Sequence, residues 1–191
     1  MSDDVNDRWK TVQNLAAAKK MILDSPQVFS PDDLRWLPLQ GRKTILDFGC
    51  GVGRNIPALL ALAPEAHIIG YDSPNMRRLA EEYLGSEQYG KIDWITPPPE
   101  NLKRVTYDLI LAVIVFQHIE EQELRNILSI LRDQLSDDGK LGINSRGWSD
   151  DHRKSVWKII LDYFVAAPES HLNLDAAVGN NHQQVVFSRK E

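Results

Sequence analysis

An aspartate and three closely spaced glycines stand out in the first third of the sequence. Asp47 is followed by Gly49, Gly51 and Gly53, with one other residue between neighbours. Glycine adopts positive φ angles at little cost and lets a ligand come close to the backbone. A helix that begins directly after the glycines points its free N–H groups and partial positive charge into the turn. The pattern therefore predicts a binding turn for a ligand that carries a carboxylate or a phosphate.

The spacing of the glycines separates two classes of nucleotide-like ligand. A nicotinamide or flavin site requires the pattern G-x-G-x-x-G, whose third glycine lets helix and strand pack closely. Counted from Gly49, that third position is Arg54, and counted from Gly51 it is Ile56. Neither position is a glycine, so the sequence disfavours a dinucleotide.

The segments around this turn alternate between strand-like and helix-like patterns, which places the glycines between a strand and a helix. From Lys43 onward, short apolar runs are followed by amphipathic stretches. We expect strands at Thr44–Phe48, His67–Tyr71, Lys91–Thr96, Asp108–Phe116 and Lys140–Asn144. We expect helices from the glycine turn to Leu62 and at Asn75–Leu84, Glu120–Leu135 and His152–Val165. In such a sheet, ligands bind at the carboxyl ends of the strands, where the glycine turn would lie.

The end of the chain has a different pattern. Asn173–Val178 and Gln184–Arg189 flank a loop that opens with Gly179-Asn180-Asn181, which predicts an antiparallel hairpin. Five strand–helix alternations followed by a hairpin predict an α/β fold, with an open, mainly parallel sheet covered by helices on both faces. We expect one domain over residues 1–191, with a helical N-terminal cap at 1–40 and an α/β core at 43–191.

The glycine turn and the acid that follows it resemble a known family. The pattern acid-x-G-x-G-x-G, with Asp72 at the end of the second predicted strand, is similar to motif I and the following region of the class I S-adenosylmethionine-dependent methyltransferases. The resemblance extends over roughly Lys43 to Gly147 and includes the closing hairpin. It implies a three-layer α/β/α Rossmann-like sheet with strand order 3-2-1-4-5-7-6, in which strand 7 is antiparallel. It also implies S-adenosyl-L-methionine as cofactor, S-adenosyl-L-homocysteine as product and methyl transfer as the reaction.

The resemblance assigns roles to individual residues around the turn. Asp72 would hold the ribose hydroxyls, and Asp47 would position the turn and the amino end of the ligand. Cys50 is expected as a small residue in a tight loop rather than a nucleophile, because no suitably spaced base accompanies it. Ser73 and Met76 would border the adenine, although Met76 suits a structural role equally well. The implied cofactor-binding residues are Asp47, Gly49, Cys50, Gly51, Gly53, Asp72, Ser73, Met76, Pro98, Pro99, Glu100, Ala112 and Val113.

The end of the third predicted strand departs from the family pattern. Many relatives carry an acid there for the adenine amino group, followed by a backbone N–H for a ring nitrogen. In this sequence Pro98 stands at the acid position and Pro99 follows it. Proline has no backbone N–H, so one expected contact is missing. We expect Glu100 or a neighbouring backbone group to replace the other, and the prolines to form a stiff wall against the adenine ring.

The residues after the fourth predicted strand are the candidates for proton transfer. Methyl transfer from a sulfonium is an in-line displacement, in which positioning supplies much of the rate. His118 could take a proton from a hydroxyl or amine acceptor; its alternative role is to cap the following helix or bond the scaffold. The segment Phe116–Ile119 does not match the [N/D]-P-P-[Y/F] motif of enzymes that methylate base amines or glutamine amides. We expect no metal site, because Asp150 and Asp151 follow the fifth strand but no carboxylate matches them after the fourth.

Few residues are available to shape an acceptor pocket. Aromatic walls with a charged group suit a small organic acceptor. The candidate acceptor-binding residues are Trp9, Gln117, Arg146 and Trp148. Because no long insertion separates the predicted strands, a small molecule is the expected acceptor.

Composition narrows the class of partner and the compartment. The net charge is −5, and no Lys/Arg run is longer than a pair, which disfavours nucleic acid. The longest apolar run, Leu109–Phe116, is far shorter than the roughly 20 residues of a membrane span. One cysteine and no secretory pattern in the first residues favour a cytoplasmic location. Monomer and homodimer both remain open.

Three functions are compatible with these observations. The first is a methyltransferase that acts on an oxygen or nitrogen of a small molecule. The second is a methyltransferase of RNA or protein, which the acidic balance and the missing motif disfavour. The third is a non-catalytic subunit that binds S-adenosylmethionine or serves as a scaffold.

Overall fold

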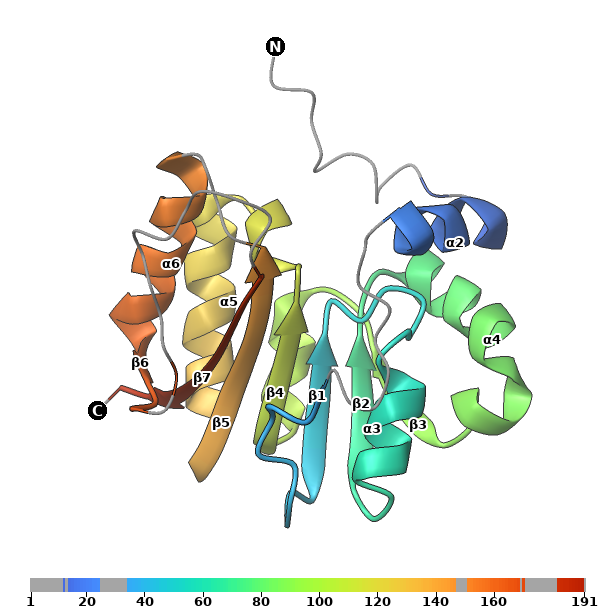
Figure 1. Cartoon of the computed structure of the whole chain (residues 1–191), viewed down its shortest axis with the longest axis horizontal. Helices are drawn as coiled ribbons and strands as arrows, with labels where there is room; N and C mark the ends of the chain where they lie inside the picture. The colour runs from blue at the N-terminus through green and yellow to red at the C-terminus, as the bar shows by residue number, and fades with distance from the viewer. Residues whose placement is uncertain are drawn as a thin grey trace.

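A seven-stranded sheet forms the centre of the molecule (Figure 1). The computed structural model describes residues 12, 14–24, 34–146, 151–168, 170 and 182–190. The strands are β1 (Thr44–Phe48), β2 (His67–Tyr71), β3 (Ile92–Ile95), β4 (Tyr107–Val113), β5 (Leu135–Arg146), β6 (Phe164–Ala166) and β7 (His182–Arg189). The helices are α2 (Leu15–Asp24), α3 (Ile56–Leu62), α4 (Pro74–Tyr89), α5 (Glu121–Gln134) and α6 (Asp151–Tyr163), with 3₁₀ turns η2 (Pro99–Arg104) and η3 (Phe116–His118).

The order of the strands confirms the predicted topology. Neighbouring strands follow the order β3-β2-β1-β4-β5-β7-β6. The pairs β3–β2, β2–β1, β1–β4 and β4–β5 are parallel, whereas β7 is antiparallel to both β5 and β6. Because the parallel strands run in one direction, the carboxyl ends of β1, β2 and β4 meet at one edge of the sheet. The glycine turn and Asp72 therefore lie at the same edge.

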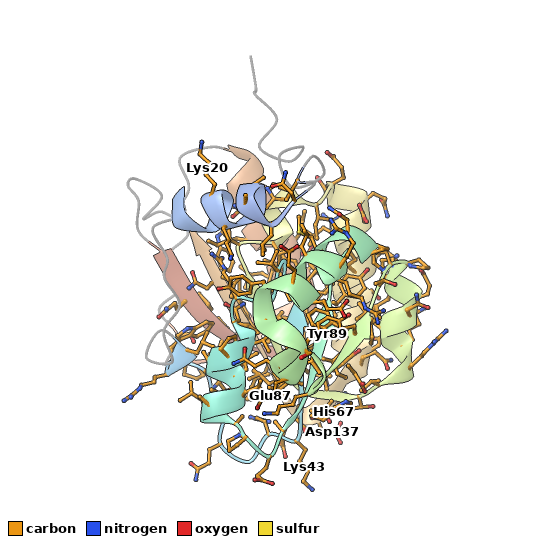
Figure 2. All side chains as sticks on the ribbon, turned by 90° about the vertical axis from the view of Figure 1, so that its right-hand side faces the viewer. Lys20, Lys43, His67, Glu87, Tyr89 and Asp137 are labelled. Atoms are coloured by element: carbon orange, nitrogen blue, oxygen red, sulfur yellow. The ribbon has the colours of Figure 1, made fainter. Side chains whose placement is uncertain are left out.

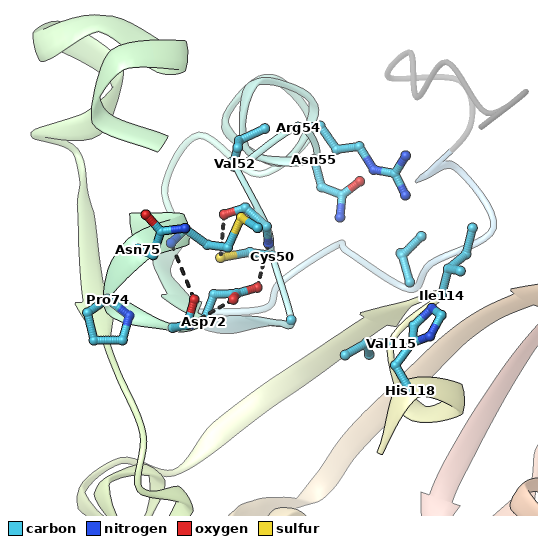
Figure 3. Close-up of a pocket in the computed structure, with 15 residues that line it drawn as sticks. Cys50, Val52, Arg54, Asn55, Asp72, Pro74, Asn75, Ile114, Val115 and His118 are labelled. Carbon is cyan, nitrogen blue, oxygen red and sulfur yellow. Dashed lines mark hydrogen bonds between the residues drawn. The ribbon is translucent and has the colours of Figure 1, made fainter. Parts of the chain in front are cut away.

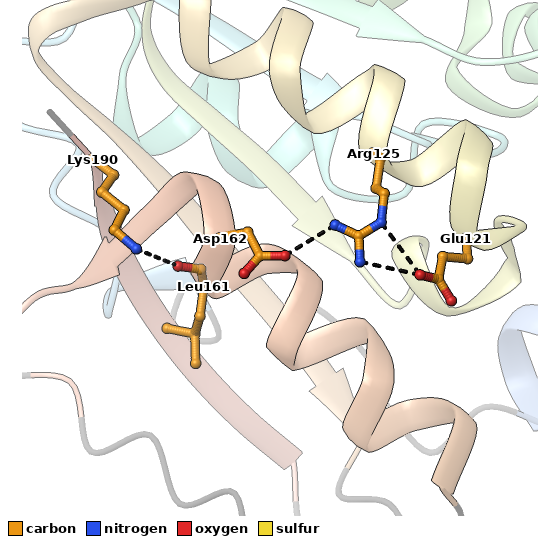
Figure 4. Close-up of polar contacts among 5 residues, drawn as sticks. All are labelled: Glu121, Arg125, Leu161, Asp162 and Lys190. Carbon is orange, nitrogen blue, oxygen red and sulfur yellow. Dashed lines mark hydrogen bonds and ion pairs between the residues drawn. The ribbon is translucent and has the colours of Figure 1, made fainter.

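Apolar side chains cover both faces of the sheet. On one face, residues of α5 and α6 pack against β4, β5 and β7, with Leu128, Leu131 and Ile160 almost fully buried. On the other face, α3 and residues 34–39 pack against β1 and β4. Arg125 of α5 joins the first pair of helices at the surface, because its guanidinium contacts Glu121 at 3.1 Å and Asp162 of α6 at 2.9 Å (Figure 4). The predicted layers are confirmed.

The partner of β7 at the sheet edge corrects the predicted hairpin. The expected first strand of that hairpin, Asn173–Val178, lies outside the described residues. β7 instead pairs with Phe164–Ala166, whose first two residues belong to the end of the predicted helix His152–Val165. Phe164 is buried and Val165 is 51% exposed, which is the alternation of a half-buried edge strand. The alternation of buried and exposed residues begins within an apolar run that continues the helical pattern. The sequence therefore gives no clear sign of where the helix ends and the strand begins.

Several predicted boundaries shift, and two of these differences occur at residues with positive φ. β4 ends at Val113 rather than Phe116, since Ile114 adopts a φ of 54° and stops the strand. α4 continues past the predicted end at Leu84 to Tyr89, across a kink at Gly85 whose φ is 73°. The turn after β4 is therefore tighter than a continuous strand would allow.

The helix α2 lies against the carboxyl edge of the sheet. Val12, Leu15 and Ala18 are buried against the glycine turn and α4 in one apolar cluster, which also contains Val52 and Met76. Figure 2 shows Lys20 of α2 at one end of the molecule and Lys43, His67 and Asp137 at the other. Val12 and α2 thus lie over the end of the sheet that carries the glycine turn. Within the part of the chain that the structure describes, no helix is both long and apolar enough to cross a bilayer.

Asp108 fixes the relative position of β1 and β4 at their amino ends. Its Oδ2 accepts hydrogen bonds from the backbone N–H groups of Lys43 and Thr44, both at 3.0 Å, and its Oδ1 accepts one from Ser136 at 3.1 Å. Partial burial raises the pKa of this carboxyl, but the hydrogen bonds outweigh it and hold the pKa below its ordinary value. The ionised carboxylate therefore stabilises the folded chain.

Replacing Asp108 with alanine should lower the free energy of unfolding by about 1–2 kcal/mol at pH 7, because two backbone donors lose a charged partner. The depressed pKa means that this contribution is present above the unfolded pKa of 3.8 and is lost as the pH falls through the lower folded pKa. Urea unfolding at pH 7 and pH 3 measures both effects. Asp133→Ala, which removes an exposed partner of Arg132, is the control and should cost less than about 0.5 kcal/mol. Equal losses in the two variants would contradict this role.

Candidate functional site

The glycine turn after β1 has the backbone conformation that its sequence predicts. Gly49, Gly51 and Gly53 have φ angles of 69°, 58° and 78°. A Cβ atom on Gly49 would lie 2.2 Å from Cγ2 of Val115, so no larger residue fits there without movement. The N–H of Gly49 donates to the carbonyl of Tyr71 at 2.8 Å, which joins the turn to the end of β2. The glycines therefore let the turn run close to the loop after β4.

Asp72 bridges the glycine turn and the start of α4. Its Oδ2 accepts a hydrogen bond from the N–H of Gly51 at 2.8 Å, and its Oδ1 accepts one from the N–H of Ser73 at 2.7 Å (Figure 3). The Ser73 hydroxyl in turn accepts a 3.3 Å hydrogen bond from the N–H of Met76 and caps the helix. Burial raises the pKa of Asp72, although these N–H donors oppose the rise.

Asp47 lies fully buried beneath the turn and is bound by a side chain of the next helix. The Asn55 amide nitrogen donates to both carboxylate oxygens, at 3.1 and 3.2 Å. Burial raises the pKa of Asp47 from 3.8 to about 7; the hydrogen bond from Asn55 and the charge of Arg54 lower it, and the charge of Asp72 raises it. Asp47 therefore changes its protonation state near neutral pH.

A cavity of about 630 Å³ opens beside these groups (Figure 3). This volume is in the range of about 300–1,000 Å³ that is usual for small-molecule sites. Its walls come from the glycine turn, the start of α4 and the loop after β4. The lining residues are Gly49, Cys50, Gly51, Val52, Arg54, Asn55, Asp72, Ser73, Pro74, Asn75, Met76, Val113, Ile114, Val115 and His118.

Many of the predicted cofactor residues meet at this cavity. Those that line it are Gly49, Cys50, Gly51, Asp72, Ser73, Met76 and Val113. Asp47 does not line the cavity but accepts a hydrogen bond from Asn55, which does; Gly53 and Ala112 lie in the adjoining turn and strand without lining it. Cys50 is buried, and burial raises the pKa of its thiol well above the ordinary value, with Asp72 and Asp47 adding to the rise. A protonated thiol is a poor nucleophile, as expected for a small loop residue.

The expected proline wall does not form part of the cavity. Pro98, Pro99 and Glu100 are absent from its lining. They lead into η2, which packs against α5 and contains the fully buried Leu102. Pro74 and Asn75 at the start of α4 line the cavity instead.

Of the predicted catalytic and acceptor-binding residues, only some lie at the cavity or within the described residues. His118 lines the cavity, and its Nε2 lies 3.0 Å from Nε2 of Gln117, which itself is outside the lining. With the Gln117 nitrogen as donor, this contact leaves Nε2 of His118 as the acceptor. Arg146 ends β5, but its side chain is outside the described residues, as are Trp9 and Trp148 altogether.

Several lining residues were not predicted from the sequence. Asn55 precedes α3 at the position of a helix cap, yet it makes no cap hydrogen bond and donates to Asp47 instead. Its place directly after the glycine motif is a signal that could have pointed to it. Ile114 and Val115 gave no such signal, because a β-branched residue with positive φ runs against its backbone preference.

Known proteins resemble this chain in sequence and in fold. A family model described as "Methyltransferase domain" matches residues 46–141, just over half of the chain. A TehB-like SAM-dependent methyltransferase from Corynebacterium glutamicum superposes with a TM-score of 0.64 at 18% identity, over 93% of this chain and 100% of that one. The N-methyltransferase NodS from Bradyrhizobium japonicum, solved with S-adenosyl-L-homocysteine, gives 0.58 at 15% identity, over 100% and 90%.

A third solved structure is larger than this chain. Human N-acetylserotonin methyltransferase in complex with SAM superposes with a TM-score of 0.69 at 11% identity, over 100% of this chain and 60% of that one. At these identities the structural likeness is one of fold, whereas the family model matches the sequence from β1 to β5. The sheet order, the glycine turn and the family match together show that this chain belongs to the class I S-adenosylmethionine-dependent methyltransferases.

Proposed function

We propose that this chain binds S-adenosylmethionine in the cavity beside the glycine turn and transfers its methyl group to an oxygen or nitrogen of a small molecule. The observation that carries the proposal is the Asp72 carboxylate, which ends β2, lines a cavity of about 630 Å³ and is fixed by the N–H of Gly51. Family membership supports methyl transfer as the reaction, and the geometry of these residues supports the position proposed for the cofactor.

Asp72 suits the ribose of the cofactor. A carboxylate has about four acceptor positions, and the two backbone N–H groups occupy one position on each oxygen. Each oxygen therefore keeps a lone pair for a ribose hydroxyl. Because the N–H donors fix the carboxylate before the ligand arrives, little side-chain entropy is lost when the sugar binds.

The two buried acids suit the charge of the ligand. S-adenosylmethionine carries a sulfonium and an ammonium group, both positive, and a single carboxylate. Asp47 and Asp72 both have raised pKa values because burial disfavours their charged forms. A cationic ligand relieves this penalty, since an opposite charge nearby favours the ionised carboxylates. The start of α3 offers the ligand carboxylate no free donor at its first two residues, because the N–H of Ile56 donates to the carbonyl of Gly53 and Pro57 has no N–H.

When bound, S-adenosylmethionine supplies an electrophilic methyl group on a sulfonium. The chain's own residues orient the reactants and accept the proton that the methyl acceptor loses. Val113, Ile114 and Val115 provide apolar walls that exclude water from the reacting atoms. His118 faces the same cavity and, as a neutral imidazole, accepts at Nε2 the proton that a hydroxyl or amine acceptor loses, once the Gln117 donor has turned away from that nitrogen. Gln117 fixes the orientation of that ring through the 3.0 Å contact.

A small-molecule acceptor agrees with the shape of the described site. The acceptor side of the cavity is bounded by one short 3₁₀ turn, η3, and by the loop from Ile114 to Val115. The net charge of −5 disfavours nucleic acid as the acceptor. The human neighbour is itself named for the methylation of a small molecule, N-acetylserotonin.

Replacing Asp72 with alanine should weaken the binding of S-adenosylhomocysteine by about 10–100-fold, because hydrogen bonds to a charged group contribute about 1.5–3 kcal/mol. Isothermal calorimetry measures the affinity. Asp93→Ala, which removes an exposed aspartate of β3, is the matched control and should leave the affinity unchanged. Undiminished binding in Asp72→Ala would remove Asp72 from the site, and no binding by the parent protein would overturn the proposal.

Replacing His118 with alanine tests proton transfer. A screen with S-adenosylmethionine labelled with tritium in the methyl group, over metabolite, tRNA and protein pools, first identifies the acceptor; label in tRNA or protein would contradict the small-molecule proposal. With that acceptor, the variant should lose about 10²–10⁴-fold in kcat and the rise of rate with pH, because general base catalysis is of this size. Its affinity for S-adenosylhomocysteine should change by less than about threefold. An unchanged pH–rate profile would exclude His118 as the base.

A further inference from the structure

Asp47 and Asn55 form a buried pair between the sheet and the cavity. Asp47 is 0% exposed and Asn55 2% exposed. The Asn55 nitrogen donates to both oxygens of Asp47, at 3.1 and 3.2 Å, whereas its side-chain oxygen has no hydrogen-bond partner among the described residues. Asn55 also lines the cavity (Figure 3). A buried acceptor without a partner is costly, so its retention needs a physical reason.

The protonation state of Asp47 determines which way the Asn55 amide faces. An ionised carboxylate only accepts hydrogen bonds, so it requires the amide nitrogen on its side and turns the amide oxygen away. A protonated Asp47 can donate to that oxygen, and the reverse orientation is then satisfied equally well. The proton on Asp47 thus decides whether the amide atom of Asn55 that points away from Asp47 is an acceptor or a donor.

The charges around Asp47 place this change near neutral pH. Burial acts most strongly and disfavours the ionised form; Asn55 and Arg54 favour it, and Asp72 disfavours it, with a resulting pKa of about 7. A positive group in the cavity would add to the effect of Arg54 and favour ionisation. Binding of a cation and loss of the Asp47 proton are therefore linked.

We propose that Asn55 is a cofactor-contacting residue whose free side-chain oxygen accepts a hydrogen bond from the ammonium group of S-adenosylmethionine when Asp47 is ionised. This inference rests on the proposed function and specifies that the Asp47–Asn55 pair binds the ammonium end of the ligand. A ligand with the ammonium group draws Asp47 into its ionised form and releases a proton when it binds at or below neutral pH. A ligand without that group gains nothing from the pair.

Two ligands that differ only in the amino group separate this effect from general binding. The probes are S-adenosylhomocysteine and its deaminated analogue, in which hydrogen replaces the amino group. Binding is measured by calorimetry at pH 5.5–7.5. This range lies below the α-amino pKa of about 7.7–8.0, so the amino group of S-adenosylhomocysteine stays mostly protonated. The affinity for S-adenosylhomocysteine should fall by about twentyfold between pH 7.5 and 5.5, as linkage to one group near pH 7 requires. The analogue should change by less than about threefold.

Variants assign the effect to Asn55. Asn55→Ala should lower the affinity for S-adenosylhomocysteine by about tenfold or more at pH 7.5 and change the affinity for the analogue by less than about threefold. Asn55→Asp should move the midpoint of the pH dependence upward, because two adjacent carboxylates resist double ionisation. Asn75→Ala is the matched control, since Asn75 lines the same cavity but donates to the carbonyl of Val12 instead of Asp47. It should leave the midpoint unchanged.

The outcomes distinguish this inference from the proposed function. Equal pH dependence of the two ligands, or equal weakening of both in Asn55→Ala, would overturn the role of Asn55 and leave cofactor binding intact. No binding of either ligand by the parent protein would overturn the proposed function itself. If Asn55→Ala fails to fold, the comparison of the two ligands on the parent protein still decides.

Discussion

The hydrogen bond from the N–H of Gly51 to the Asp72 carboxylate is the interaction on which the site depends. It joins the turn after β1 to the end of β2, and the N–H of Gly49, which donates to the carbonyl of Tyr71, strengthens the same junction. The cavity lies where both strands end at one edge, and these hydrogen bonds hold the two turns together at a fixed distance. Gly49 must lack a side chain for this, since Val115 of the next loop occupies the space. The parallel sheet therefore supplies the position of the site, and the glycines supply its shape.

The buried polar groups of the site lower the stability of the empty protein but suit the binding of a cationic ligand. Two carboxylates, Asp47 and Asp72, are buried with raised pKa values, and Asn55 contributes an unpaired acceptor. Each of these features destabilises the empty protein, because burial disfavours charge and unpaired polar groups. Together they place acidic and acceptor groups beside the cavity. Such groups suit a ligand that carries a sulfonium and an ammonium group, as we propose for this site.

The sequence predicts the parts of the structure that local patterns determine. The bounds of β1 and β2 were predicted to the residue, since short β-branched runs flanked by turn residues have few alternatives. The glycine turn and Asp72 followed from spacing, and the strand order from the family resemblance. Features set by tertiary contacts were missed. Pro98 and Pro99 lead into η2 and do not line the cavity, pairing with β7 places Phe164 and Val165 in a strand rather than in the predicted helix, and Ile114 adopts a conformation that its residue type disfavours. Likewise, the contact between Asn55 and Asp47 depends on how α3 packs against β1.

The position of a bound ligand tests the central claim most directly. In a crystal structure of the complex with S-adenosylhomocysteine, both ribose hydroxyls should lie within hydrogen-bonding distance, about 2.5–3.0 Å, of the Asp72 carboxylate oxygens. The thioether should lie between the glycine turn and His118. A nucleoside seated elsewhere, or in this cavity with its ribose away from Asp72, would contradict the account.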